Sequence, residues 1–150
     1  MDFEFEEEAS FLIDTEIDED IQFNGEKILV ADDNDTNLDI TKTIFEEVGL
    51  SVDTAENGND ALKLFLASED NSYKMILLDI DMYGMDGCDT AKAIRQCGRE
   101  DGASAPIYAL TAYSSREYVR KARESGMTGY LTKPVNYPEL FSLMKKEFDK

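Results

Sequence analysis

The sequence predicts an α/β fold in which a five-stranded parallel sheet is flanked by five helices. Three observations predict it: short apolar runs recur along the chain, amphipathic segments of helical length separate them, and glycine-containing turns mark several junctions. The 150 residues are enough for one domain with a core that needs no disulfide. Right-handed crossovers in such a fold bring the carboxyl ends of all the strands to one edge of the sheet.

The expected elements follow one another from Lys27 onward. The strand-length runs are residues 28–31, 50–54, 75–79, 106–110 and 130–131. The helical segments that alternate with them are residues 36–48, 59–67, 88–97, 115–125 and 138–148. Apolar residues recur at helical spacing most clearly in the first helix (Leu38, Thr41, Ile44, Phe45, Val48) and the last (Leu140, Met144, Phe148).

Residues that begin or end helices occupy the junctions. Gly49 and Gly126 stand directly after helical segments, where a residue of left-handed conformation closes the last turn. Asn57-Gly58 predicts a turn before the second helix. Pro138 falls in the first turn of the last helix, where its missing N–H costs no hydrogen bond.

Composition excludes several classes of function. The net charge of −18 argues against nucleic acid and anionic membranes as partners, because both require basic residues. The absence of histidine excludes Ser–His and Cys–His catalysis, histidine metal sites and a phosphohistidine within this chain. Cys88 and Cys97 fall on opposite sides of one expected helix and cannot bridge, and the acidic N-terminus is unlike a secretory signal. We therefore expect a cytoplasmic protein.

Residues 1–24 differ in kind from the rest. They hold ten acids and no Lys or Arg, together with eight Phe, Ile and Leu residues, too many for a fully solvated tail. We interpret them as an acidic tail or interdomain linker with partial docking, and residues 25–150 as the folded domain.

Polar residues follow four of the five expected strands, at the edge where ligands bind in such sheets. Three carboxylates within roughly 5 Å would repel by about 3 kcal/mol per pair, so such a cluster protonates or holds a hard cation such as Mg²⁺. A lysine and a threonine beside that cation could bind phosphoryl oxygens, and a carboxylate there is a competent nucleophile. The residues concerned are Asp32, Asp33, Asp79, Asp81, Thr111 and Lys133.

Four motifs in order and at matching spacing resemble the receiver domains of two-component response regulators and hybrid histidine kinases. They are Lys27-Ile-Leu-Val-Ala-Asp32-Asp33-Asn34, Leu77-Leu78-Asp79-Ile-Asp81-Met82-Tyr83-Gly84-Met85-Asp86-Gly87, Ala109-Leu110-Thr111-Ala112 and Gly126-Met-Thr-Gly-Tyr130-Leu-Thr-Lys133-Pro134. The resemblance covers the chain from about Glu26 to its end and implies the flavodoxin-like strand order 2-1-3-4-5.

The resemblance also implies roles for these residues. Asp79 matches the phosphoacceptor. Asp33, Asp79 and the backbone carbonyl of Asp81 match Mg²⁺ ligands, with Asp32 acting partly through water. Lys133 matches the lysine that pairs with phosphoryl oxygens, and the Lys133–Pro134 peptide is expected to be cis. Thr111 and Tyr130 match the switch pair, and Ala112 a position kept small for phosphate access.

The function implied is Mg²⁺-dependent transfer of a phosphoryl group to Asp79 from a phosphohistidine of a histidine kinase or histidine phosphotransfer domain. Phosphorylation would switch a partner-binding face built from the fourth helix, fifth strand and fifth helix, which could also form a weak homodimer. We expect the C-terminal receiver of a hybrid histidine kinase. Such a domain promotes its own phosphorylation and dephosphorylation but is not a turnover enzyme alone.

Two alternatives remain open. One is a receiver-fold binding module that phosphorylation does not switch. The other is an aspartyl-phosphate phosphatase of haloacid-dehalogenase type, because Asp79-Ile80-Asp81 resembles that family's opening motif, although Tyr83 does not fit it. Tyr83 also departs from the proline common in receivers, which should loosen the loop after Asp79.

The fourth expected helix is the one basic segment of the chain. It carries Arg116, Arg120, Lys121 and Arg123 against two acids. This face is either simply solvated or contacts an acidic surface, for which the chain's own N-terminal segment is one candidate.

Overall fold

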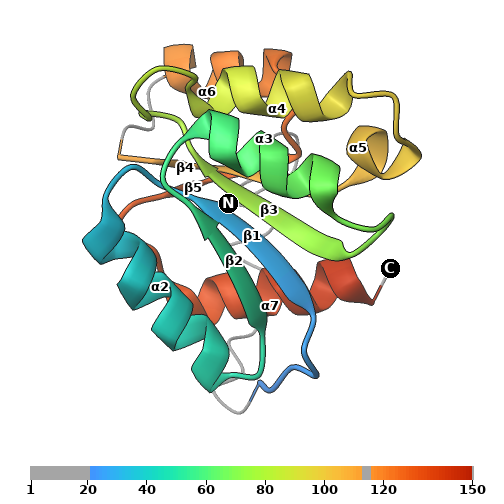
Figure 1. Ribbon diagram of the computed structural model, residues 1–150. Helices are drawn as coiled ribbons and strands as arrows, with labels where there is room; N and C mark the ends of the chain where they lie inside the picture. Colours follow the sequence, from blue (N-terminus) through green and yellow to red (C-terminus); the bar gives the residue numbers. More distant parts are fainter. Residues whose placement is uncertain (1–20, 113–115, 150) are drawn as a thin grey trace.

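The computed structural model describes residues 21–112 and 116–149, which form a parallel sheet between two layers of helices (Figure 1). The elements in chain order are β1 (Lys27–Ala31), α2 (Asp35–Glu47), β2 (Ser51–Ala55), α3 (Gly58–Ala67), β3 (Tyr73–Asp79), α4 (Gly87–Arg95), α5 (Glu100–Ser104), β4 (Ile107–Thr111), α6 (Arg116–Glu124), β5 (Gly129–Thr132) and α7 (Tyr137–Phe148). The strands pair in the order β2-β1-β3-β4-β5, all parallel. The predicted fold class and strand order are confirmed.

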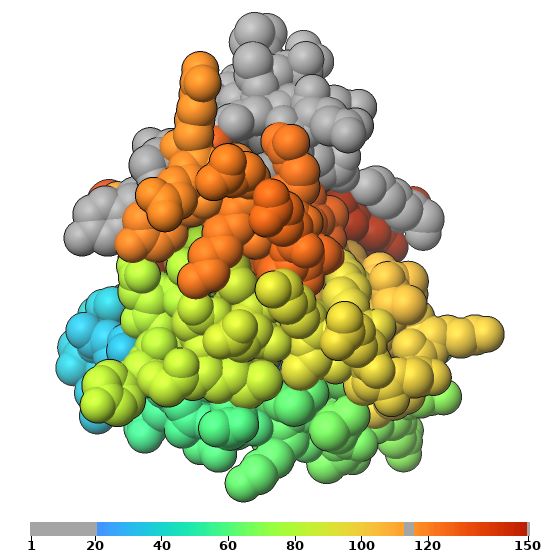
Figure 2. Space-filling model, turned by 90° about the horizontal axis from the view of Figure 1, so that it is seen from above, coloured from blue at the N-terminus to red at the C-terminus, as the bar shows by residue number. Residues whose placement is uncertain are grey.

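Two helical layers bury the two faces of the sheet. Helices α2 and α7 cover one face, and α3, α4 and α6 cover the other (Figure 1). Alternate strand residues serve the two layers: Val30 and Leu77 belong to the α2–α7 core, whereas Leu29 and Ile76 belong to the opposite one. Figure 2 looks onto the second layer, where α6 (orange) lies beside the α4 segment (yellow-green). The central strand β3 is thus enclosed on both sides, as expected for a parallel sheet.

Side-chain caps fix the helices that begin at the carboxyl edge of the sheet. Asn34 accepts a 3.0 Å hydrogen bond from the Asn37 N–H, and Asp86 accepts one of 2.8 Å from the Asp89 N–H. Gly49 follows α2 and Gly126 follows α6, and both have φ of +93°, which confirms their predicted place after a helix.

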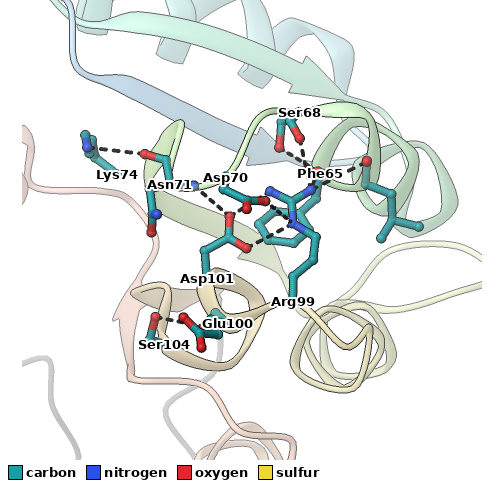
Figure 3. Close-up of polar contacts among 10 residues, drawn as sticks. Phe65, Ser68, Asp70, Asn71, Lys74, Arg99, Glu100, Asp101 and Ser104 are labelled. Atoms are coloured by element: carbon teal, nitrogen blue, oxygen red, sulfur yellow. Dashed lines mark hydrogen bonds and ion pairs between the residues drawn. The ribbon is translucent and has the colours of Figure 1, made fainter.

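The short helix α5 was not expected from the sequence. It has five residues and no side-chain cap, so it shows too few turns for an apolar period to appear. Arg99, just before it, forms a short ion pair of 2.7 Å with Asp101 (Figure 3). The same guanidinium donates to the carbonyls of Phe65 and Ser68 at the end of α3, at 2.9 and 3.0 Å. Arg99 therefore ties α5 to α3 at the edge opposite the strand carboxyl ends.

Residues just before β1 join the core. Ile21 and Phe23 are buried, and the Phe23 N–H donates a 2.7 Å hydrogen bond to the Val48 carbonyl. The Phe23 ring packs edge-on against Phe141 and Phe148 of α7, with centroids 6.1 and 5.7 Å apart. Residues 1–20, which hold the ten acids of the N-terminal segment, lie outside the described residues.

Candidate functional site

Carboxylates from two neighbouring strands meet at the carboxyl edge of the sheet. Ala31 of β1 pairs with Leu78 of β3, so the next residues, Asp32 and Asp79, stand side by side. Both are buried, with 5% and 4% of their surface exposed, whereas Asp33 is exposed. One carboxylate oxygen from each of these three residues lies within 4.8 Å of the others. The predicted meeting of Asp32, Asp33 and Asp79 is confirmed.

Lys133, from the turn after β5, reaches the same cluster. Its ammonium nitrogen lies 3.0 Å from Asp79 Oδ2 and 3.2 Å from Asp32 Oδ2, and a quarter of its side chain is exposed. The Lys133 N–H donates a 2.8 Å hydrogen bond to the Thr111 carbonyl, which fixes the turn beside β4. The Lys133–Pro134 peptide is cis, as the resemblance implies.

Backbone N–H groups hold the other oxygens of the two buried carboxylates. The Asn34 N–H donates to Asp32 Oδ1 and the Asp81 N–H to Asp79 Oδ1, both at 3.0 Å. Each carboxylate therefore has one oxygen on the backbone and one on Lys133. This arrangement orients both groups before any ligand arrives.

The protonation equilibria of Asp79 and Lys133 shift in the same direction. Burial raises the pKa of Asp79 above its ordinary value, and the nearby charge of Asp32 adds to this, against the opposing effect of Lys133. Burial alone would lower the pKa of Lys133, but its hydrogen bonds and attraction to Asp79 and Asp32 raise it overall. Lys133 therefore carries a full charge at neutral pH, and this charge favours the ionised form of the Asp79 carboxylate that it contacts.

The other predicted site residues lie outside the group formed by the three carboxylates and Lys133. Thr111 is buried at the end of β4, and Ala112 directly after it is exposed. Tyr130 is buried on β5, one strand farther from Asp79. The Asp81 side chain is exposed and lies outside the group of three carboxylates.

The loop after β3 connects the cluster to α4. Tyr83, which stands in place of the common proline, is 91% exposed, and Gly84 adopts a φ of +76° that favours glycine. The loop closes tightly at Gly87, where a Cβ atom would clash with the carbonyl of Asp79. The first residue of α4 thus packs directly on the backbone of Asp79.

A groove that the sequence did not indicate opens beside the cluster. It has a volume of about 470 Å³ and runs from Asp32 and Lys133 to Ile40 of α2, to Val135 before α7 and to Tyr137, the first residue of α7. Ile40 is 49% exposed in its wall. The only signal in the sequence is one isoleucine on an otherwise polar side of the first helix, which by itself has no specific meaning.

The cluster has the donor chemistry of a divalent-cation site. Carboxylate oxygens on an open rim suit Mg²⁺, which binds through a few carboxylates and keeps several waters. The neighbouring lysine would balance the charge of a bound oxyanion.

A family model decides what this arrangement is: the response regulator receiver domain model matches residues 28–145. The chain belongs to the receiver domain family. Its strand order and the position of Asp79 on the third strand agree with that assignment and set aside the haloacid-dehalogenase alternative.

Curated relatives are much longer proteins with similar receivers. Sensor histidine kinase GacS of Pseudomonas protegens is 35% identical over 133 residues, which are 88% of this chain and 14% of that protein. Osmosensing histidine protein kinase SLN1 of Saccharomyces cerevisiae is 34% identical over 135 residues, 88% of this chain and 11% of that protein. The chain thus spans less than a fifth of these relatives and is a two-component receiver domain similar to those of hybrid histidine kinases.

Solved receiver structures match the fold closely. The receiver domain of the sensor histidine kinase PA1611 from Pseudomonas aeruginosa, with magnesium coordinated in its active-site cleft, is 27% identical with a TM-score of 0.75; the match covers 84% of this chain and 99% of that one. The Francisella response regulator 1452 receiver domain is 31% identical with a TM-score of 0.71, covering 83% and 98%. Among the described residues, no helix is long and apolar enough to cross a membrane.

Proposed function

We propose that Asp79 accepts a phosphoryl group from a phosphohistidine of a histidine kinase or phosphotransfer domain, in a reaction that requires Mg²⁺. The observation that carries this proposal is the bridge from Lys133 to two buried carboxylates, 3.0 Å from Asp79 and 3.2 Å from Asp32. The ammonium of a lysine in this place can pair with the carboxylate first and with the incoming phosphoryl oxygens afterwards. The sequence has no histidine, so the donor histidine lies outside it.

The transfer needs little covalent chemistry from the protein. An oxygen of ionised Asp79 attacks phosphorus and forms the acyl phosphate O–P bond. The N–P bond of the donor breaks, its electron pair returns to the imidazole nitrogen, and that nitrogen takes up a proton from solvent. The domain contributes position, because Asp79 is already oriented by the Asp81 N–H, and charge balance through Lys133.

Asp33, Asp79 and the backbone carbonyl of Asp81 would hold the Mg²⁺ ion, with Asp32 acting partly through water. Bound there, Mg²⁺ would neutralise the negative charge shared by the carboxylates and the phosphoryl oxygens. We assign Thr111 to move its hydroxyl to the phosphoryl group and Tyr130 to rotate inward behind it. Ala112 would leave room for the phosphoryl oxygens. Partners would then read the face of α6, β5 and α7, and a weak homodimer could use the same face.

The groove beside Lys133 is the surface we assign to the donor domain. It opens directly onto the cluster and carries exposed apolar surface at Ile40, so a donor helix seated there would bring its phosphohistidine to Asp79. The parent protein we propose is a hybrid histidine kinase, in keeping with the relatives above.

Intact-mass spectrometry after incubation with acetyl phosphate tests the proposal. The expected result is one phosphoryl adduct that forms with Mg²⁺, is lost with a chelator, and is absent from the folded Asp79→Asn variant. A wild-type protein that stays unmodified with Mg²⁺ while its fold is intact would favour the binding module that phosphorylation does not switch.

A further inference from the structure

Helix α6 is fastened to α4 by two cationic side chains, one at each end of the contact. Toward the end of α4, Arg95 Nε donates a 2.8 Å hydrogen bond to the carbonyl of Gly126, just after α6. At the start of α4, Lys121 of α6 forms a 2.9 Å ion pair with Asp86. Figures 1 and 2 show the two helices side by side along this contact.

The Arg95 contact is the more permanent of the two. Its guanidinium is partly buried and also donates to the Gly102 carbonyl at 3.1 Å. Gly126 leaves little room for change, because a Cβ there would press on the Arg95 side chain at 3.1 Å. Because the acceptors are neutral main-chain carbonyls, this end should be less sensitive to salt than an ion pair is.

The Lys121 contact is the one that can open. The side chains of Lys121 and Asp86 are 52% and 23% exposed, so the pair is screened by salt and contributes modestly. Hydrogen bonds from the Asp89 N–H and from Lys121 nevertheless outweigh burial and lower the pKa of Asp86. The pair is therefore fully charged at neutral pH.

Asp86 and the next residue, Gly87, connect Lys121 to the phosphoacceptor Asp79 through direct contacts. The other carboxylate oxygen of Asp86 caps α4, and its carbonyl accepts a 2.8 Å hydrogen bond from the Thr90 hydroxyl. The next residue, Gly87, packs on the Asp79 carbonyl and donates its N–H to the Ile80 carbonyl at 3.3 Å. Direct contacts thus connect Lys121 through Asp86 and Gly87 to the backbone of Asp79.

In the loop between Asp81 and Asp86, Met82 is buried in the core, whereas Tyr83 and Gly84 are exposed. Tyr83 is almost fully exposed, and Gly84 contributes the freedom of its positive φ. Without a proline at position 83, the far end of this loop is held by the packing of Met85 on Gly58, by the α4 cap and by Lys121.

We propose that Lys121 is a positioning residue: through Asp86 it holds the loop that follows Asp79 and thereby links the placement of α6 to phosphorylation. This inference rests on the proposed function of Asp79. By linkage, a phosphoryl group that displaces the loop weakens the ion pair, and an α6 drawn away by a partner slows phosphorylation.

Four variants of the full chain separate this role from a general effect of charge. Lys121→Gln removes the ammonium, and Asp86→Asn removes the carboxylate charge while asparagine still caps α4. Lys121→Arg keeps the pair. Arg120→Gln is the matched control, because Arg120 is a cation on the same helix and forms its ion pair with Glu124 within α6, at 3.9 Å.

The rate of adduct formation from acetyl phosphate, measured against Mg²⁺ concentration, is the first readout. Lys121→Gln and Asp86→Asn should each slow it about threefold, the range an exposed ion pair allows, and the double variant should be no slower than either. Lys121→Arg and Arg120→Gln should match the wild type. A ninefold loss in the double variant, an equal loss in Arg120→Gln, or an unchanged rate in Lys121→Gln would overturn the inference.

Amide hydrogen exchange of residues 80–90 tests the same contact without a phosphoryl donor. Exchange should be faster in Lys121→Gln and unchanged in Arg120→Gln; equal exchange in all three proteins would overturn the inference. If the wild type forms no adduct, the proposed function fails, and this exchange measurement still decides whether Lys121 holds the loop.

Discussion

At the scale of single residues, Asp79 is placed for reactivity at a cost in stability. Its carboxylate is 4% exposed and stands beside Asp32, with one lysine shared between them. Burial raises the pKa of Asp79, which means that the folded state disfavours its ionised form. The group that must be ionised to attack phosphorus is therefore a group whose charge the fold disfavours.

Replacing Asp79 with asparagine should stabilise the protein at neutral pH in the absence of Mg²⁺. Asparagine keeps the shape and the hydrogen bond from the Asp81 N–H but removes the buried charge. We expect the melting temperature to rise by about 2–4 °C, the shift that about 1 kcal/mol gives in a domain of this size. Thermal unfolding followed by circular dichroism measures it.

The sign of the pH dependence follows from the raised pKa of Asp79. The stability associated with protonated Asp79 is fully present below the ordinary value of 3.8 and is lost as the pH rises through the higher folded-state pKa. The advantage of Asp79→Asn should therefore be large at pH 8 and shrink toward pH 4. A melting temperature below that of the wild type at pH 8 would contradict this account of the site.

At the scale of elements, helix α2 presents Ile40 to the groove that opens on the cluster. We expect Ile40→Asp to reduce phosphoryl transfer from a phosphorylated histidine phosphotransfer domain about tenfold, because an apolar contact at the centre of an interface contributes on the order of 1–2 kcal/mol. The rate with acetyl phosphate should not change, because this small donor does not need the groove. Single-turnover transfer, followed by loss of label from the donor, measures the effect.

Leu66 on α3 provides the matched control for this prediction. It is 49% exposed, the same fraction as Ile40, but it lies on the other helical layer and away from the groove. Leu66→Asp should leave transfer from both donors unchanged. Equal losses in the two variants would show that the effect is not specific to the groove.

Most elements could be predicted from the sequence because their signals are local. The apolar run that ends in Asp79 and the glycines that follow helices, Gly49 and Gly126, each act within a few residues. Helix α5 could not be predicted, since its stability comes from Arg99 and from contacts with α3 that are distant in sequence. The groove is also lined by residues from separate segments of the chain, so no local sequence pattern predicts it.

At the scale of the whole molecule, the folded unit extends beyond the motifs that define the family. Ile21 and Phe23 precede β1 yet lie in the same core as α2 and α7. Their burial was not specified by the sequence, where alternating and helical apolar spacings coexist in the N-terminal segment. We propose that the unit required for stability includes Ile21 and Phe23.

Phe23→Ala should destabilise the protein by about 3 kcal/mol, the loss typical of a buried phenylalanine. The corresponding fall in melting temperature is about 6–12 °C. Gln22→Ala, at an exposed neighbouring position, should have no such effect. Deletion of residues 1–24 should lower the melting temperature at least as much as Phe23→Ala does, and an unchanged melting temperature after that deletion would contradict this account.

The meeting of Asp32, Asp79 and Lys133 depends on the whole fold as well, and the sequence predicted this meeting from the strand order. Asp32, Asp79 and Lys133 are far apart in the chain, but each directly follows or ends a strand. Because parallel strands place their carboxyl ends at one edge of the sheet, recognising the polar residue at the end of each strand is enough to predict that these side chains meet. The contact of Lys121 with Asp86 escaped prediction because it joins two helix surfaces whose relative placement no strand register sets.

The most direct test of the central claim is to locate the phosphoryl group within the chain. Borohydride reduces an aspartyl phosphate to homoserine, so peptide mapping after acetyl phosphate, Mg²⁺ and borohydride reveals which aspartate was modified. We predict homoserine at position 79 alone, with aspartate retained at positions 32, 33 and 81. Homoserine at any of those three positions, with position 79 unmodified, would contradict the assignment of Asp79 as the phosphoacceptor.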